Sequence, residues 1–217
     1  SNAKFLYETN VGAGLPVINT LHALLNSGDT IIRIEAVLSG TLSYIFNNYV
    51  GDNTFAEVVR TAQELGYTEP DPRDDLNGMD FSRKMLILGR EIGLPLEMSN
   101  VNIKDFLPED CLKAESIPAF YEELEKHEPY FSSFKNEAEN SGRKLRLIGV
   151  LEDGKINIEV QIVDANHPFF GLSGSDNIIS FTTSRYKNTP LVVKGPGAGA
   201  EVTAAGVFAD LVRVTAQ

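Results

Sequence analysis

LRLIGVLEDGKINIEVQIV, residues 145–163, contains two runs in which apolar side chains alternate with polar ones. The runs flank Asp153-Gly154, a dipeptide typical of the two-residue turn of a β-hairpin. Two more β-rich runs follow, NIISFTTS at 177–184 and LVVK at 191–194. The later half of the chain is therefore predicted to form antiparallel strands.

Helical spacing dominates the earlier half. Helices are predicted from Pro16 to about Gly28, from Thr54 to Gly66 and from Met79 to Ile92. Early helices followed by late strands predict an α+β fold, with a mixed or antiparallel sheet and helices on one face. Further predicted elements are a short strand and a glycine-rich turn within 5–16, a strand at 31–39, a helix over LSYIFNNY after a break at Gly40-Thr41, one helix around 117–141 and a helix after the glycines of 195–199.

Composition narrows the possible functions. The chain has 217 residues and a formal net charge of −11, which disfavours binding to nucleic acid. One cysteine excludes an intrachain disulfide and a cysteine zinc cluster, and the three histidines lack metal-ligand spacing. The sequence contains no apolar run long enough for a membrane span. These features predict a soluble, cytoplasmic protein that binds neither nucleic acid nor membrane.

Residues 66–84, GYTEPDPRDDLNGMDFSRK, concentrate charge directly before an apolar helix. A calcium loop with Gly78 at its sixth position would place Arg73 at the first ligand position and Lys84 at the twelfth, which excludes an EF-hand. Asp80 and Lys84 are four residues apart and share one helix face. On a solvated face they would form an ordinary ion pair. At the margin of the core, the lysine could instead exchange a proton with a reacting oxygen while nearby carboxylates bind an ammonium group.

Two glycine loops raise the question of a dinucleotide site. Gly12-Ala13-Gly14 lacks the third glycine of the fingerprint, whereas residues 195–200 read as G-x-G-x-x-A between a strand and a helix. Only 17 residues follow Ala200, too few for a complete Rossmann unit. This loop is either a tight turn or a contact to a cofactor held mainly by another domain.

The stretch from Ala62 to Lys84 resembles the signature of the homoserine dehydrogenase family. ETNVGAGLPVI (8–18), LSGTLSYIFN (38–47) and GPGAGAEVTAAGVFADL (195–211) match further family segments in order. The chain is most similar to the dehydrogenase end of bifunctional aspartate kinase–homoserine dehydrogenases. The resemblance implies interconversion of L-aspartate 4-semialdehyde and L-homoserine with NADP or NAD, on the route to threonine and methionine.

The resemblance also implies roles for individual residues. Lys84 matches the proton donor and acceptor at the substrate oxygen, and Gly199 matches a contact to the nicotinamide cofactor. The matching substrate-binding residues are Glu69, Asp80, Asp75, Gly40 and Thr41. A monovalent-cation site, usually sodium, matches Glu8, Val11, Ala13 and Leu15.

The family begins with a nucleotide-binding Rossmann domain that has no counterpart before Lys4, so we expect the chain to be a piece of a longer enzyme with little activity alone. Residues 1–3 are interpreted as a tag remnant, 4–16 as a linker strand and cation-site loop, 17–144 as the catalytic region, 145–195 as a strand-rich dimerisation region, and 196–217 as a helix returning to the nucleotide-binding domain. A homodimer or higher homo-oligomer is expected. The alternative function is a non-catalytic amino-acid-binding or regulatory module.

Overall fold

A six-stranded sheet organises the described part of the chain. The structure is a computed structural model that describes residues 4–104 and 106–215, so the predicted tag remnant at 1–3 lies outside it. The strand order is β2-β4-β3-β1-β5-β6, with β2 parallel to β4 and the other neighbours antiparallel. The strands are β1 (Ile31–Val37), β2 (Val101–Ile103), β3 (Lys144–Glu152), β4 (Lys155–Val163), β5 (Asp176–Thr183) and β6 (Leu191–Pro196). The prediction of an α+β fold with a mixed sheet is confirmed.

The predicted hairpin supplies two adjacent strands of this sheet, which lie between β2 and β1. β3 and β4 pair along their whole length up to Glu152 and Lys155, which flank the turn. Asp153 and Gly154 have φ values of +51° and +72°, as a two-residue hairpin turn requires. The turn chemistry therefore set both the position and the register of these strands.

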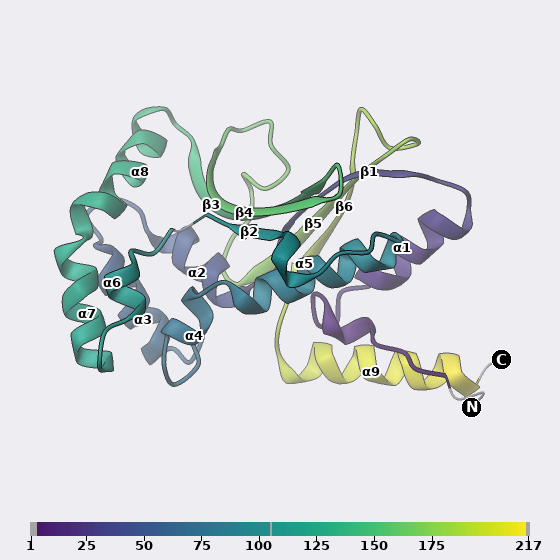
Figure 1. Ribbon diagram of the computed structural model, residues 1–217, viewed down its shortest axis with the longest axis horizontal. Coiled ribbons are helices and arrows are strands. Elements are labelled where there is room, and N and C mark those ends of the chain that lie inside the picture. Colours follow the sequence, from purple (N-terminus) through teal and green to yellow (C-terminus); the bar gives the residue numbers. More distant parts are fainter. Residues whose placement is uncertain (1–3, 105, 216–217) are drawn as a thin grey trace.

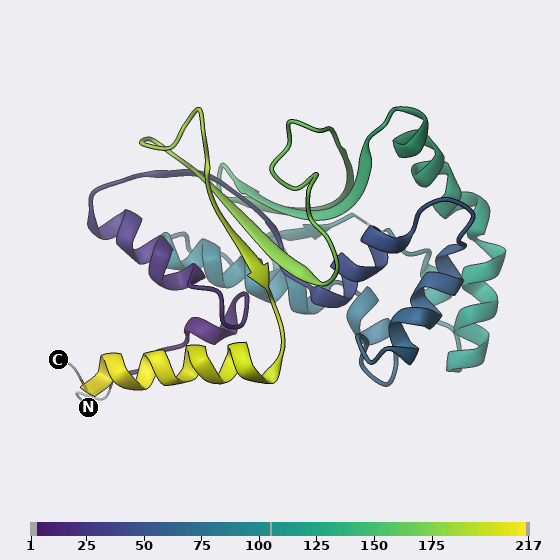
Figure 2. The same ribbon diagram turned by 180° about the vertical axis from the view of Figure 1, so that it is seen from behind.

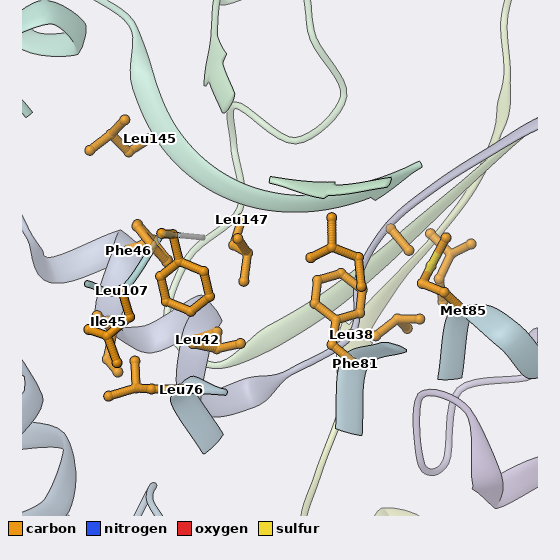
Figure 3. Packing of buried hydrophobic residues seen from close by; sticks show 14 of the residues in the cluster. Leu38, Leu42, Ile45, Phe46, Leu76, Phe81, Met85, Leu107, Leu145 and Leu147 are labelled. Carbon is orange, nitrogen blue, oxygen red and sulfur yellow. The ribbon is translucent and has the colours of Figure 1, made fainter. Parts of the chain in front are cut away.

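Helices cover one face of the sheet, as Figures 1 and 2 show. The covering helices are α1 (Val17–Asn26), α2 (Gly40–Asn48) and α5 (Met79–Glu91). α5 approaches β3 closely at Gly149, where a Cβ atom would lie 2.9 Å from Met85 Cγ and 3.0 Å from a ring carbon of Phe81. Figure 3 shows Phe81 and Met85 in the core with Leu38 and Leu147. This packing fixes the helix that carries Asp80 and Lys84.

Further helices gather beyond one end of the sheet (Figure 1). The helix predicted to start at Thr54 is present, and the structure adds a capping box in which Glu57 is the reciprocal partner of Thr54. The single helix predicted around 117–141 is wrong, because the chain breaks at His127 and Pro129 then occupies the first turn of a second helix. These elements are α3 (Phe55–Glu64), α4 (Arg73–Leu76), α6 (Glu109–Leu112), α7 (Ile117–Lys126) and α8 (Glu128–Asn140), with a short 3₁₀ helix η2 (Met98–Asn100) before β2.

Two predictions near the chain's beginning also need correction. No strand forms at residues 5–7; the segment leads into the 3₁₀ helix η1 (Glu8–Asn10) and lies beside α9 (Ala200–Thr215) (Figure 2). The Glu8 amide donates to the Asp210 carboxylate at 3.0 Å, so α9 rather than a sheet edge holds this segment. The strand predicted at 31–39 ends at Val37, and α2 begins at Gly40, two residues before the predicted helix LSYIFNNY.

The opposite face of the sheet is covered at one end by the loop between β4 and β5. Phe169 and Leu172 of this loop are buried against strand residues. The guanidinium of Arg146, also buried, donates to the carbonyls of Phe169, Phe170 and Leu172 at 3.0–3.1 Å. Burial lowers the pKa of Arg146 to about 10. Within the described residues, no helix is long and apolar enough to cross a membrane.

Candidate active site

Lys84 lies where β1, α2 and α5 meet. Its ammonium donates to the Leu38 carbonyl at 2.9 Å and forms an ion pair with Asp80 Oδ2 at 2.8 Å. The Lys84 side chain is 21% exposed, whereas that of Asp80 is 63% exposed. The structure therefore confirms the predicted shared face and its place at the margin of the core. A partly exposed ammonium fixed at two points is suited to hydrogen-bond an oxygen atom that approaches from solvent.

The acidic turn around α4 is tied to the start of α2. The Asp75 carboxylate accepts a hydrogen bond from the Glu69 amide at 2.8 Å and lies 2.9 Å from Thr41 Oγ1. Thr41 Oγ1 also lies 2.6 Å from the Tyr67 carbonyl, so its single proton can serve only one of these acceptors at a time. Burial raises the pKa of Asp75, and the neighbouring charges of Asp74 and Asp80 add to this effect.

The turn does not direct all its carboxylates towards Lys84. Asp75 binds Thr41 and the Glu69 backbone, and Asp71 pairs with Arg73 within the turn. The Arg73 guanidinium reaches the Ala114 carbonyl as well. Part of the charge in this motif therefore builds the loop, and Glu69, Asp74 and Asp80 are its exposed carboxylates.

α2 offers a site for a negative group at its first turn. Ser39 Oγ caps the helix by accepting from the Leu42 amide at 3.2 Å. Gly40 and Thr41 follow the cap, and unpaired amides at the start of a helix favour anions. Ser43 Oγ donates to the Asp176 carbonyl at 2.9 Å, which joins this turn to β5. Gly40 and Thr41 thus lie at the strand-to-helix turn, as predicted.

Tyr67 is a site residue that the sequence analysis missed. Its ring stacks on Tyr44 with centroids 4.4 Å apart, and its carbonyl faces Thr41. The residue stands directly before Thr68-Glu69, but a single exposed tyrosine carries no periodic signal.

The glycine loop between β6 and α9 lies beside β5. Gly199 has a φ of +123°, a conformation that favours glycine. A Cβ atom on Gly197 would overlap the side-chain amide of Asn177. That amide is completely buried, and neither of its polar atoms has a partner among residues 4–104 and 106–215. Position 197 therefore admits only glycine, because the Asn177 amide fills the space that a side chain would need.

The predicted cation-site residues lie together in the loop around η1. Glu8 is buried, and its carboxylate accepts from the Ile18 and Asn19 amides at 2.8 and 2.9 Å, so it caps α1. Burial raises the pKa of Glu8. The predicted members Val11 and Leu15 are also buried, and the described residues contain no cluster of three or more His, Cys, Asp or Glu side chains able to hold a metal.

A cation in this loop would therefore depend on backbone carbonyls. The Glu8 and Leu15 carbonyls already accept from the Val11 and Val17 amides at 3.4 and 2.8 Å. Ala13 has a left-handed φ of +49°, which turns its peptide out of the regular path.

Comparison with known proteins assigns the chain to a family. The family model for homoserine dehydrogenase matches residues 16–212. The chain belongs to the homoserine dehydrogenase family. This family catalyses the NAD(P)H-dependent reduction of aspartate semialdehyde to homoserine.

Homoserine dehydrogenases resemble the chain over nearly its whole length. It is 50% identical over 216 residues to the chloroplastic bifunctional aspartokinase/homoserine dehydrogenase 2 of Arabidopsis thaliana, covering 99% of this chain and 24% of that protein. It is 46% identical over 225 residues to the homoserine dehydrogenase of Schizosaccharomyces pombe, covering 100% of this chain and 60% of that protein. A solved hyperthermophilic archaeal homoserine dehydrogenase in complex with NADPH has a TM-score of 0.73 at 26% identity, covering 99% of this chain and 56% of that one.

Proposed function

We propose that this chain is the substrate-binding and catalytic portion of an enzyme that interconverts L-aspartate 4-semialdehyde and L-homoserine with NADP or NAD. The observation that carries the proposal is the Lys84 ammonium, held between the Leu38 carbonyl and Asp80 beside the acidic turn. The chain spans only 24% and 60% of the two relatives named above, so the activity of the whole protein is part of the proposal.

Each polar group of the substrate has a counterpart in the site. The negative end of an amino acid suits the first amides of α2 at Gly40 and Thr41. Its ammonium suits the carboxylates of Glu69 and Asp80, while Asp75 positions Thr41 and the Glu69 backbone. The aldehyde oxygen then faces Lys84, which places the reacting carbon between the substrate turn and the glycine loop.

Lys84 performs the proton transfer. A bound nicotinamide supplies or accepts the hydride, and Gly199 is the residue proposed to contact it. When the aldehyde is reduced, negative charge develops on its oxygen; the ammonium stabilises this charge and donates a proton, giving the alcohol. In the reverse direction the amine of Lys84 accepts the alcohol proton. Asp80 keeps the side chain directed at the oxygen through its ion pair.

The nucleotide is proposed to be held mainly by a separate nucleotide-binding domain that meets α9. Exposed apolar side chains on this helix include Phe208, at 66% exposure, and Leu211, at 59%. Such a row on one helix suits a covering domain. The chain alone is therefore expected to show little or no dehydrogenase activity.

A homodimer or higher oligomer built by residues 145–195 is also proposed. Helices cover one face of the sheet, whereas the loop between β4 and β5 covers only one end of the other (Figures 1 and 2). β6 is an edge strand, and edges commonly pair with a second copy. Light scattering of this chain at high micromolar concentration tests the proposal, and a monomer there would oppose it.

The loop from Glu8 to Leu15 is proposed to hold a monovalent cation, with sodium the first candidate. Backbone carbonyls of Glu8, Val11, Ala13 and Leu15 would be its ligands. A melting temperature that rises with sodium but not with a bulky organic cation at equal ionic strength would support this site.

A cytoplasmic location of this protein remains a prediction. The Arabidopsis relative is a chloroplastic protein, so the chloroplast is the alternative compartment.

The decisive assay for the proposed function uses the complete enzyme, meaning this chain with its nucleotide-binding domain. NADPH or NADH oxidation is followed with L-aspartate 4-semialdehyde and with a simple aldehyde that lacks the amino acid. Turnover restricted to the amino-acid aldehyde is expected. Amino-acid binding without turnover would favour the alternative, a regulatory module.

A further inference from the structure

Asn177, on β5, is a buried polar residue that the proposed reaction does not use. Its exposure is 0%, and its Nδ2 and Oδ1 atoms have no hydrogen-bond partner in the described part of the chain. A buried polar group without a partner destabilises the folded state, because it has lost its hydrogen bonds to water. The same fold satisfies the buried Arg146 with several loop carbonyls, so an amide with both ends unpaired is not the rule here.

Asn177 lies between the two halves of the candidate site. It pairs with Gly195 across β5 and β6, and its amide lies against Gly197 in the glycine loop. On its other side, Val37 of β1 pairs with Ile178. One further step in that antiparallel register places Leu38, whose carbonyl holds Lys84, opposite Asn177.

The glycine loop is able to supply the missing partners. Asn177 offers two donor hydrogens and one acceptor oxygen, and peptide groups offer the complementary acceptor and donor. No side chain on Gly197 separates the amide from the loop backbone, so a small rotation of the peptides at Gly197–Gly199 would bring them into hydrogen-bond geometry. Glycine permits such rotation at low steric cost.

We propose that Asn177 is a positioning residue whose amide binds the peptide groups of the glycine loop in the shape that the loop adopts around the nicotinamide cofactor. This inference rests on the proposed function. The unpaired amide disfavours the present loop conformation, and pairing it favours the cofactor-bound one.

The first experiment measures the stability of this chain alone. In Asn177→Leu, an apolar side chain of similar size removes two unpaired polar atoms, so the melting temperature should stay equal or rise. Ser180→Ala is a matched control, because Ser180 lies on the same strand with an unpaired, buried hydroxyl but faces away from the glycine loop. A fall of several degrees in Asn177→Leu alone would show that the amide is already paired, and would overturn the inference.

The second experiment measures NADPH binding to the complete enzyme by nucleotide fluorescence. Asn177→Leu and Asn177→Ala should each raise the Kd for NADPH about tenfold, equivalent to about 1.4 kcal/mol. kcat at saturating cofactor and KM for homoserine should stay within about a factor of two, and Ser180→Ala should bind NADPH like the parent enzyme. The Ala variant covers the case in which the Leu variant does not fold.

The outcomes separate the inference from the proposed function. If the parent enzyme binds neither NADPH nor NADH, the proposed function is wrong and the inference falls with it. If the parent enzyme binds the cofactor and both Asn177 variants keep its Kd, only the inference is wrong.

Discussion

Replacing Lys84 by methionine keeps most of the apolar stem and removes the ammonium. The exposed ion pair with Asp80 contributes about 1 kcal/mol or less. The hydrogen bond to the carbonyl of fully buried Leu38 contributes more, because that acceptor loses its charged donor, at a cost of about 1–3 kcal/mol. We expect a total loss of about 2 kcal/mol in the free energy of unfolding, or about 4–8 °C in Tm for a chain of this size.

The catalytic loss should be larger than the stability loss. Removal of an acid–base group lowers kcat by about 10²–10⁴, equivalent to about 2.7–5.4 kcal/mol at the transition state. The assay is steady-state kinetics of the complete enzyme at 25 °C, with the Tm of each variant measured in parallel. Arg83→Met serves as control, because it removes one positive charge from the exposed neighbouring position on the same helix.

Two results would refute this reasoning. A Lys84→Met enzyme with near-normal kcat would remove the lysine from the proton transfer. A variant that is unfolded at 25 °C would instead show that the contact to Leu38 is mainly structural. The pair of Asp80 and Lys84 would then be an ordinary ion pair at the margin of the core, with no part in catalysis.

Three further predictions concern Glu69, Arg146 and Asp29. Glu69→Ala should raise KM for homoserine with kcat nearly unchanged, as expected for uniform binding of the ammonium; an unchanged KM would remove Glu69 from the site. Arg146→Met removes the donor from three loop carbonyls. At about 1–3 kcal/mol for each unsatisfied acceptor, we expect a loss of about 3–5 kcal/mol in the free energy of unfolding in urea, whereas a loss below about 1 kcal/mol would show that Arg146 does not hold the loop. For Asp29, burial opposes ionisation, but hydrogen bonds led by those from Ser184 and Thr183 lower its pKa from 3.8 to about 2. Its stabilisation is therefore present above about pH 4 and is lost as the pH falls through 2, so Asp29→Asn should flatten this acid-side fall in Tm, and an unaltered profile would count against it.

The sequence predicted elements whose signals are local. Asp153-Gly154 located the hairpin of β3 and β4, and Thr54 located the start of α3. The short strand β2 was not predicted, because three residues carry no periodicity and its parallel partner β4 lies far along the chain. The strand predicted at 5–7 does not form. Its local pattern was adequate, but a tertiary contact to α9 holds the segment instead of a sheet edge.

The candidate site likewise combines a contact that local spacing predicted with contacts that no local pattern could reveal. The four-residue spacing of Asp80 and Lys84 predicted their ion pair. The Leu38 carbonyl could not be predicted, since a backbone acceptor has no sequence identity. The environment of Asn177 depends on a loop that returns from β6, so no local pattern could reveal it.

The central claim is that the acidic turn and the start of α2 bind an amino-acid substrate beside Lys84. The most direct measurement is a titration of ¹⁵N-labelled chain with L-homoserine, followed by amide NMR and repeated with the Asp80→Asn variant. The account predicts shifts concentrated at Gly40, Thr41 and Glu69, and weaker binding by the variant. No shift at tens of millimolar homoserine, or shifts confined to other parts of the chain, would contradict it.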